Sequence, residues 1–181
     1  LELVKKRWLG LQKLRARFTD EELGYEGLGG YELFKDSQPN YISQINEVND
    51  LLNPLFNNTV FKDVSHQIAE KGFSTKVFSS MVFNSFEGQI HTGKTLSSLW
   101  RKAGQLGVKI LTGSEVLKVN DSLVFVKNGS EQLSFSAKKV VIATNAFTKK
   151  LISNLELNPG RGQVVITKPI SGLKCKGTFH M

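Results

Sequence analysis

The strongest folding signal in this chain is the dipeptide Asn128-Gly129, which lies between two runs of alternating apolar and polar residues. The runs are SLVFVK at 122–127 and EQLSFS at 131–136, and EVLKV at 115–119 precedes them. An Asn-Gly pair between alternating runs favours a tight turn whose twist matches that of paired antiparallel strands. The sequence therefore predicts a three-stranded antiparallel β-meander.

Helical periodicity marks three other segments. The spacing of apolar residues predicts an amphipathic helix over 1–18. A second helix is expected to start at Ser37 and end at Pro54, and a third to be capped by Thr92 and stopped by Gly107. The first helix has an apolar stripe at Leu1, Val4, Trp8, Leu11, Leu14 and Phe18.

Short β-rich stretches predict further strands outside the meander. GYELF at 30–34 is one, and 76–91 holds one or two more. VKIL at 108–111, KKVVIA at 138–143 and GRGQVVITKPI at 160–170 are apolar enough to be strands, the first of them a buried one. Helices and strands together indicate an α+β fold.

The basic balance of the chain, a net charge of +8, leaves two interpretations open. The basic residues concentrate on the first helix, which is either a solvated face or a surface for an anionic partner such as nucleic acid. The concentration consists of Lys5, Lys6, Arg7, Lys13, Arg15 and Arg17.

The cysteine and histidine residues argue against a disulfide-stabilised protein and against a metal site. The single cysteine, Cys175, excludes a disulfide within the chain. The histidines His66, His91 and His180 are far apart, so no metal-site spacing is present and no metal is expected. No apolar run approaches the roughly 20 residues that span a bilayer.

We expect a reducing, cytoplasmic setting. We also expect that the chain is cut at its N-terminal end, because it begins without Met and its first residues already have helical periodicity.

Four stretches occur in an order that resembles a known family. They are EGQIHTGKTLSSLWRKAGQLGVKILTGSEVLKV, the Asn-Gly hairpin, KKVVIATNAFTKKLI and GRGQVVITKPI. In this order they resemble the D-amino-acid oxidase / glycine oxidase family of FAD-dependent oxidoreductases, best over residues 85–170. The resemblance implies part of a two-domain FAD/NAD(P)-binding-like oxidoreductase, with the β-meander and part of a mixed substrate-domain sheet. It divides the chain into a substrate-domain portion (1–85), an FAD-domain portion (86–158) and the first returning substrate-domain strands (159–181).

One family hallmark is absent from the sequence. The G-x-G-x-x-G turn that receives the FAD pyrophosphate does not occur. Gly27-Leu28-Gly29-Gly30 is no substitute, because it follows a helix and lacks the third glycine at the right offset. The family's C-terminal part is also missing, so we expect a central fragment of a longer enzyme. FAD is the expected cofactor of the parent, and this fragment is not expected to retain it.

Small residues follow the strand VVIA and raise the question of what approaches the backbone there. In the family this strand runs beside the dinucleotide, so Ala143, Thr144, Asn145 and Ala146 are predicted to bind FAD through bare main chain. Asn145 tolerates unusual backbone angles. The alternative is an ordinary turn in which Thr144 or Asn145 caps a following helix. Two further backbone contacts to FAD follow from the resemblance: Val116 beside the adenine, and Gly162 in the R-G-Q turn.

Four side chains are candidates for positions near the substrate or the flavin. Gln89 and His91 lie in E-G-Q-I-H-T-G-K, where the family's chain enters a helix close to the flavin ring. Arg161 and Gln163 belong to the R-G-Q turn, and Arg161 suits a substrate carboxylate. A structural role is the alternative for both His91 and Arg161. The catalytic residues stay unknown.

The resemblance implies oxidation of a C–N bond by hydride transfer from a small amine or amino acid to flavin. No nucleophile with its base is evident, so covalent catalysis is not expected. Two alternatives stay open. The chain could be the FAD domain of a tRNA-modifying enzyme, which the charge of +8 would suit, or an inert truncated module. Activity of this fragment alone is not expected.

Overall fold

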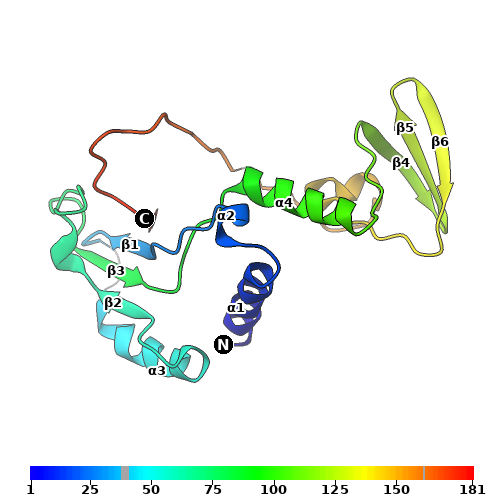
Figure 1. Ribbon diagram of the computed structural model, residues 1–181. Coiled ribbons are helices and arrows are strands. Elements are labelled where there is room, and N and C mark those ends of the chain that lie inside the picture. Colours follow the sequence, from blue (N-terminus) through cyan, green and yellow to red (C-terminus); the bar gives the residue numbers. More distant parts are fainter. Residues whose placement is uncertain (38–40, 161) are drawn as a thin grey trace. The chain divides into compact units, whose positions relative to one another are not determined.

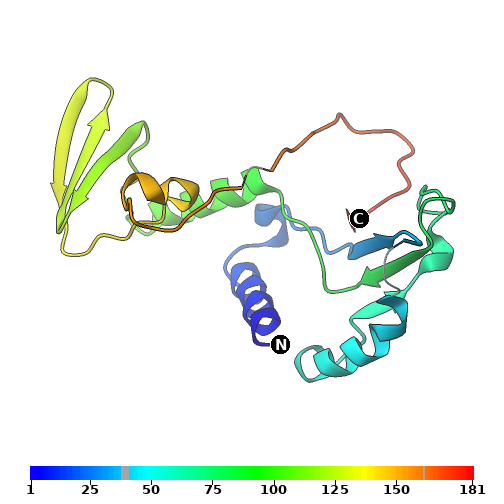
Figure 2. The same ribbon diagram turned by 180° about the vertical axis from the view of Figure 1, so that it is seen from behind.

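The computed structural model describes residues 1–37, 41–160 and 162–181, and the chain divides into two compact units. The first unit comprises Leu1–Leu106 and Pro169–Met181, and the second comprises Gly107–Lys168. Each unit has its own sheet (Figures 1 and 2). None of the helices in the described residues is long and apolar enough to cross a membrane.

The first unit is built around a four-stranded mixed sheet in the order β2-β3-β1-β7. β1 pairs antiparallel with β3 and parallel with β7, and β2 pairs antiparallel with β3. The helices α3 and α4 belong to the same unit. The elements are α1 (Glu2–Arg15), α2 (Asp20–Leu23), β1 (Gly30–Phe34), η1 (Tyr41–Gln44), α3 (Ile45–Phe56), β2 (Phe61–Asp63), η2 (Ser65–Gln67), β3 (Ser80–Asn84), α4 (Thr92–Gln105) and β7 (Thr178–His180).

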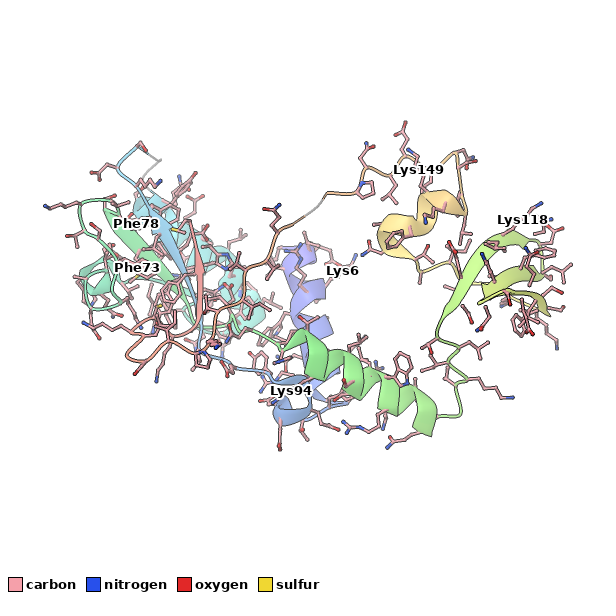
Figure 3. The ribbon with its side chains drawn as sticks, turned by 90° about the horizontal axis from the view of Figure 1, so that it is seen from above. Lys6, Phe73, Phe78, Lys94, Lys118 and Lys149 are labelled. Atoms are coloured by element: carbon pink, nitrogen blue, oxygen red, sulfur yellow. The ribbon has the colours of Figure 1, made fainter. Side chains whose placement is uncertain are left out.

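One face of this sheet carries the core of the first unit. Alternation along a strand places Tyr31 and Leu33 of β1 on this face together with Met81 of β3. Leu33 and Met81 are almost completely buried. Aromatic rings extend the cluster: Tyr31 stacks on Phe179 of β7 with ring centroids 4.8 Å apart. Figure 3 shows Phe73 and Phe78 beside the sheet, where their rings meet edge to face at 6.0 Å.

Buried hydroxyl groups attach α4 to the short helix α2. Thr95 donates to the carbonyl of Leu23 at 3.0 Å, and Ser98 donates to the carbonyl of Glu22 at 2.9 Å. Glu22 also completes a capping box with Thr19 at the start of α2. These bonds satisfy the last carbonyls of α2, which have no partner inside so short a helix.

The second unit contains the predicted meander. The strands β4 (Ser114–Asn120), β5 (Leu123–Asn128) and β6 (Glu131–Ser136) pair antiparallel in the order β4-β5-β6. Gly129 takes a positive φ of 59° at the turn, as a tight hairpin requires. The pairing of β4 with β5 shifts register between Val116 and Lys118, which leaves one extra residue on β4. The prediction of an Asn-Gly hairpin is confirmed.

Three of the predicted strands are wrong. Residues 108–111 and 138–143 form no strand. Residues 160 and 162–170 form none either, and residue 161 lies outside the described part of the chain. Val141 is 87% exposed and Val165 is 89% exposed. A strand needs a neighbour for its main-chain N–H and C=O groups, and no other described segment pairs with these three in a sheet. Their apolar pattern is real, but the pairing that would make them strands does not occur.

The predicted helices form, with different ends. Strand β1 matches the prediction, α1 ends at Arg15 instead of residue 18, and α4 stops before Gly107, whose φ is +80°. The predicted start of the second helix at Ser37 is wrong, since Ser37 lies in a turn and α3 begins at Ile45. Pro54 lies inside α3, which continues to Phe56. The N-cap of α4 is His91 in place of Thr92, since the His91 Nδ1 accepts from the Lys94 N–H at 3.3 Å. Strand β7 was not predicted from the sequence.

Candidate functional site

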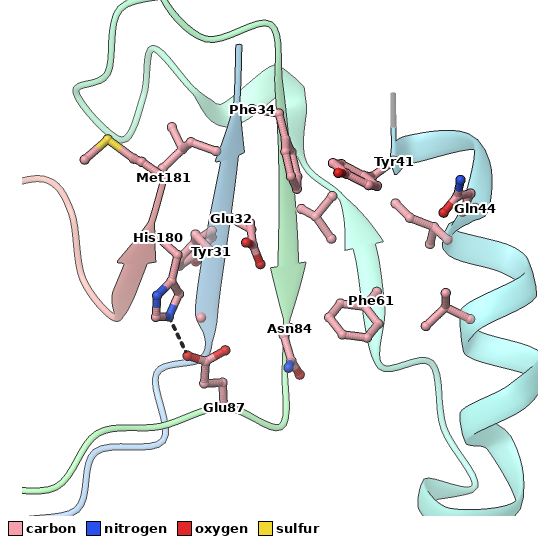
Figure 4. A pocket seen from close by; sticks show the side chains of 15 residues that line it. Tyr31, Glu32, Phe34, Tyr41, Gln44, Phe61, Asn84, Glu87, His180 and Met181 are labelled. Atoms are coloured by element: carbon pink, nitrogen blue, oxygen red, sulfur yellow. Dashed lines mark hydrogen bonds and ion pairs between the residues drawn. The ribbon is translucent and has the colours of Figure 1, made fainter. Parts of the chain in front are cut away.

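A pocket of about 430 Å³ opens in the first unit, on the face of the sheet opposite the core (Figure 4). Its floor is formed by β1 and β3, and residues of η1, α3, β2 and β7 complete the wall. Volumes of roughly 300–1,000 Å³ are typical of sites for small molecules. The pocket is therefore large enough for a ligand of that class.

Strand register explains which side chains reach the pocket. Glu32 of β1 is opposite Val82 of β3 and His180 of β7, and Gly30 is opposite Asn84 and Thr178. Directly paired residues share one face of a sheet, because side chains alternate along each strand. The residues with polar side chains in these two rows therefore lie on the same face.

The carboxylate of Glu87 joins β7 to the edge of β1. Its Oε1 accepts a hydrogen bond from the Thr178 hydroxyl at 3.0 Å and another from Nε2 of His180 at 2.8 Å. A Cβ atom built on Gly30 would collide with this carboxylate. Glycine at position 30 therefore leaves the space in which the Glu87 carboxylate lies.

A second carboxylate, that of Glu32, projects from β1 on the side that carries Phe34, Tyr41 and Phe61 (Figure 4). The rings of Phe34 and Tyr41 are in contact, with centroids 5.0 Å apart. Among the described residues, none forms a hydrogen bond or an ion pair with the Glu32 carboxylate. The pocket thus combines hydrogen-bond acceptors with aromatic walls. No group of acidic, histidine or cysteine side chains in the described residues is arranged to hold a metal ion.

The predicted FAD edge lies in the second unit. Asn145 has a φ of +45°, in the left-handed region, and begins the short helix η3 (Asn145–Lys150). Ala143, Asn145 and Ala146 are exposed, and Thr144 is half-buried. The N-cap position is Thr144, but its hydroxyl contacts that of Thr148 at 3.1 Å and caps no N–H. The small residues therefore form an open turn without a side-chain cap.

The other predicted cofactor contacts in this unit are also accessible. Val116 lies on β4 next to the register shift and is 36% exposed. Gly162 is exposed, and an added Cβ would meet no described atom within 4 Å. Gln163 is exposed as well. Arg161 lies outside the described residues. A close approach at Gly162 is thus not made by the described part of this chain, and its contact with a cofactor stays a prediction.

Gln89 and His91 belong to the first unit, where both make structural bonds. Gln89 donates from Nε2 to Glu26 at 2.7 Å, and the two residues also pair through their main chains. His91 caps α4, and its Cβ lies so near Gly24 that a side chain at position 24 would collide with it. The structural alternative for His91 therefore has support in these contacts, and a position near flavin stays a prediction for both.

Sequence reasoning missed the residues that line the pocket. Glu32, Asn84, Glu87 and His180 come from separate elements and form no motif. The one usable signal was Glu87, which begins the motif E-G-Q-I-H-T-G-K in the sequence. Only the strand pairing brings these side chains to one face.

The basic residues of α1 are exposed, and two of them have acidic partners. Arg15 forms a two-point ion pair with Asp20 at 2.8 and 2.7 Å and lies over the ring of Tyr25. Lys6 lies 3.6 Å from Glu2. The remaining cations of α1 are exposed, which fits both interpretations, so the choice between a solvated face and an anion-binding surface stays open.

Two solved structures are similar to this chain in fold. Glycine oxidase from Geobacillus kaustophilus matches with a TM-score of 0.59 and 16% identity over 86% of this chain. L-Amino acid deaminase from Proteus myxofaciens, solved in complex with anthranilate, matches with a TM-score of 0.58 and 18% identity over 81% of this chain. The chain spans 42% and 35% of these two proteins. No curated protein matches the sequence.

A family model gives the assignment that these distant likenesses cannot give. The model is described as FAD dependent oxidoreductase (DAO), and it matches residues 5–179, nearly the whole chain. This chain has an α+β fold with a mixed sheet and a β-meander, and its fold resembles that of both structures. The chain therefore belongs to the DAO family of FAD-dependent oxidoreductases.

Proposed function

We propose that this chain is part of an enzyme that oxidises a C–N bond of an amino acid or amine with FAD as the electron acceptor. The family assignment supports the flavin. The names of the two similar structures, a glycine oxidase and an L-amino acid deaminase, support an amino-group substrate. In this proposal, residues 1–85 and 159–181 belong to the substrate domain, and residues 86–158 belong to the FAD domain.

The observation that carries the proposal is the turn at residues 143–146. Its side chains are small and mostly exposed, and the φ of +45° at Asn145 is a conformation that non-glycine residues seldom adopt. Nothing in the described chain packs on this turn closely enough to explain the small residues, whereas a flat cofactor edge would. The residues present therefore fit a main-chain contact to FAD.

The residues of this chain account for only some of the contacts that FAD needs. Ala143, Asn145 and Ala146 would contact the dinucleotide through their main chains, with Val116 and Gly162 as further contacts. A phosphate-binding glycine turn is absent from the 181 residues. Binding of the pyrophosphate is thus assigned to no residue described here.

The chemistry divides between cofactor and protein. When bound, FAD accepts the hydride that leaves the carbon attached to nitrogen, and the nitrogen loses a proton, so that an imine forms and hydrolyses in water. The protein's task is to orient the substrate and exclude competing reactions. Gln89, His91, Arg161 and Gln163 are the proposed residues near the substrate or flavin. A small-molecule substrate and a cytoplasmic location complete the proposal.

The test is anaerobic reduction of bound flavin. A longer protein that includes a pyrophosphate-binding segment would be reconstituted with FAD and mixed with glycine, with L- and D-amino acids and with simple amines, and flavin absorption would be followed. We expect bleaching by at least one compound that carries an amino group and recovery of the colour in air if the enzyme is an oxidase. Bleaching by none of them, with flavin demonstrably bound, would contradict the proposed reaction.

A further inference from the structure

The pocket between β1 and α3 contains a carboxylate that lacks a cationic partner. Glu32 is exposed at the pocket and, within the described residues, has no ion pair. A second carboxylate, that of Glu87, is shared with Thr178 and His180 at one end of the pocket. Two carboxylates on one face produce a negative potential there, and a bound cation would relieve it.

Aromatic rings form another part of the pocket wall. Phe34 and Tyr41 are in ring contact at 5.0 Å, and Phe61 lies on the neighbouring strand β2. Figure 4 shows the three rings on the same side of the sheet as the Glu32 side chain. Ring faces attract organic cations and also bury apolar surface. A ligand with an ammonium group and an apolar body would satisfy both parts of the pocket.

The charges in the pocket also indicate what it rejects. No lysine or arginine is found among the described residues that line it, and the only residue able to become cationic is His180. The carboxylate of a zwitterionic amino acid would have no guanidinium or ammonium partner and would lie near two negative groups. Like charges at such distances oppose binding, and specificity arises as much from this repulsion as from attraction.

We propose that this pocket binds a primary or secondary ammonium ion that has an aromatic or other apolar body and no carboxylate. Glu32 accepts a hydrogen bond from the ammonium group. Phe34, Tyr41 and Phe61 contact the apolar body, and Asn84 lies beside them as a further polar group. The proposal concerns binding to the first unit and does not depend on the proposed flavin reaction.

The experiment uses benzylamine as the probe and calorimetry on the full chain. Phenylalanine, which adds a carboxylate, and benzyl alcohol, which lacks the charge, are the comparison ligands. We expect benzylamine to bind about tenfold more tightly than either, since a charge-assisted hydrogen bond is worth at least that factor. Added salt should weaken only the binding of benzylamine.

Two variants locate the ligand. Glu32→Gln preserves the size of the side chain and removes its charge, and should weaken benzylamine binding about tenfold. Glu47→Gln is the matched control on the exposed surface of α3, outside the pocket lining, and should change nothing. Tyr41→Ser, at a partly exposed position, should weaken benzylamine and benzyl alcohol alike, because it removes an aromatic wall and no charge. Circular dichroism verifies that each variant is folded.

Three results would overturn the proposal: equal affinity for benzylamine and phenylalanine, an unchanged affinity in Glu32→Gln, or no benzylamine binding. If Glu32→Gln fails to fold, the comparison of benzylamine with phenylalanine and benzyl alcohol, together with Tyr41→Ser, still tests the proposal. A flavin-loaded sample of a longer protein that includes a pyrophosphate-binding segment shows whether the ligand is also a substrate. Benzylamine that bleaches the flavin is a substrate, and benzylamine that binds without bleaching is a separate ligand of the pocket; both results support an ammonium site.

Discussion

The Glu87 carboxylate and the His180 imidazole, 93 residues apart in the chain, are joined by a hydrogen bond of 2.8 Å. A carboxylate can only accept, so Nε2 of His180 is the donor. Thr178 donates to the same oxygen at 3.0 Å. Strand β7 has three residues and, among the described strands, pairs with β1 alone, so these two side-chain bonds add to the main-chain pairing and to the packing of Phe179 on Tyr31.

Replacing Glu87 with alanine should loosen β7. We expect a loss of about 1 kcal/mol in the free energy of unfolding, since the bonds are partly exposed. Faster amide exchange at residues 178–180 should accompany it. Urea unfolding and hydrogen-exchange mass spectrometry are the measurements. Glu70→Ala is the control, at an exposed glutamate outside the sheet, and should leave exchange at β7 unchanged. Equal exchange in both variants would show that main-chain pairing and the packing of Phe179 hold the strand without the Glu87 bonds.

Gly30→Ala should act through the same carboxylate. The added Cβ would collide with the Glu87 side chain, which can rotate away only by giving up its bonds to Thr178 and His180. The destabilisation should therefore nearly vanish when Glu87 is already alanine, and a double-mutant cycle measures this. Gly10→Ala, at a site in α1 with open space, is the control and should not destabilise the protein. Additive effects of the two changes would contradict the shared mechanism.

Acid should release the ion pair between Arg15 and Asp20. The hydrogen bonds from Arg15 lower the pKa of the Asp20 carboxyl below its ordinary value of 3.8. A lowered pKa means that the pair stabilises the fold fully above the unfolded-state pKa, and that this contribution is lost as the pH falls through the lowered value. An NMR titration of the Asp20 carboxyl should show the shift, and Arg15→Gln should abolish it. Arg17→Gln is the control, and an unchanged titration in Arg15→Gln would contradict the assignment.

The 181-residue chain by itself should retain little FAD. The turn at 143–146 offers main-chain contacts on one side, but no G-x-G-x-x-G turn is present to bind the pyrophosphate at a helix N-terminus. Absorption spectra after mixing with FAD and gel filtration measure retention. A yellow protein with stoichiometric flavin would show that this chain holds the cofactor by other means.

Local signals in the sequence were enough for elements whose partners are close along the chain. The Asn128-Gly129 hairpin and the helix α4 depend on residues within a few positions, and both form, although α4 is capped by His91 in place of Thr92. The stretch 138–143 has a strand's composition, but strand formation needs a neighbour, which no local pattern supplies. Strand β7 was missed for a related reason: its three residues pair with a strand about 150 positions earlier.

The pocket could not be predicted from the sequence, because the residues that line it are also far apart along the chain. Glu32 belongs to no motif, Glu87 only begins a motif in which other residues were singled out, and single acidic residues usually lie on a solvated surface. The register of β1 with β3 places Glu32 opposite Val82, and the bonds to Thr178 and His180 hold Glu87, which follows β3, at the end of the same pocket. The turn at 143–146 was predictable, because its small residues and the backbone tolerance of Asn145 are properties of the residues themselves.

The cofactor edge can be tested at Ala146, in a protein that includes a pyrophosphate-binding segment. Ala146→Leu adds about three heavy atoms to an exposed position on the turn. If FAD packs against this turn, overpacking should cost about 1–3 kcal/mol, or roughly 5- to 150-fold in flavin affinity. Flavin content per protein is the measurement, with circular dichroism to verify the fold. Ala16→Leu, at an exposed alanine of the first unit, is the matched control and should keep its flavin. Because Ala146 is exposed, a turn that contacts only solvent would accept leucine without any change in flavin content, and that result would remove the cofactor contact from residues 143–146.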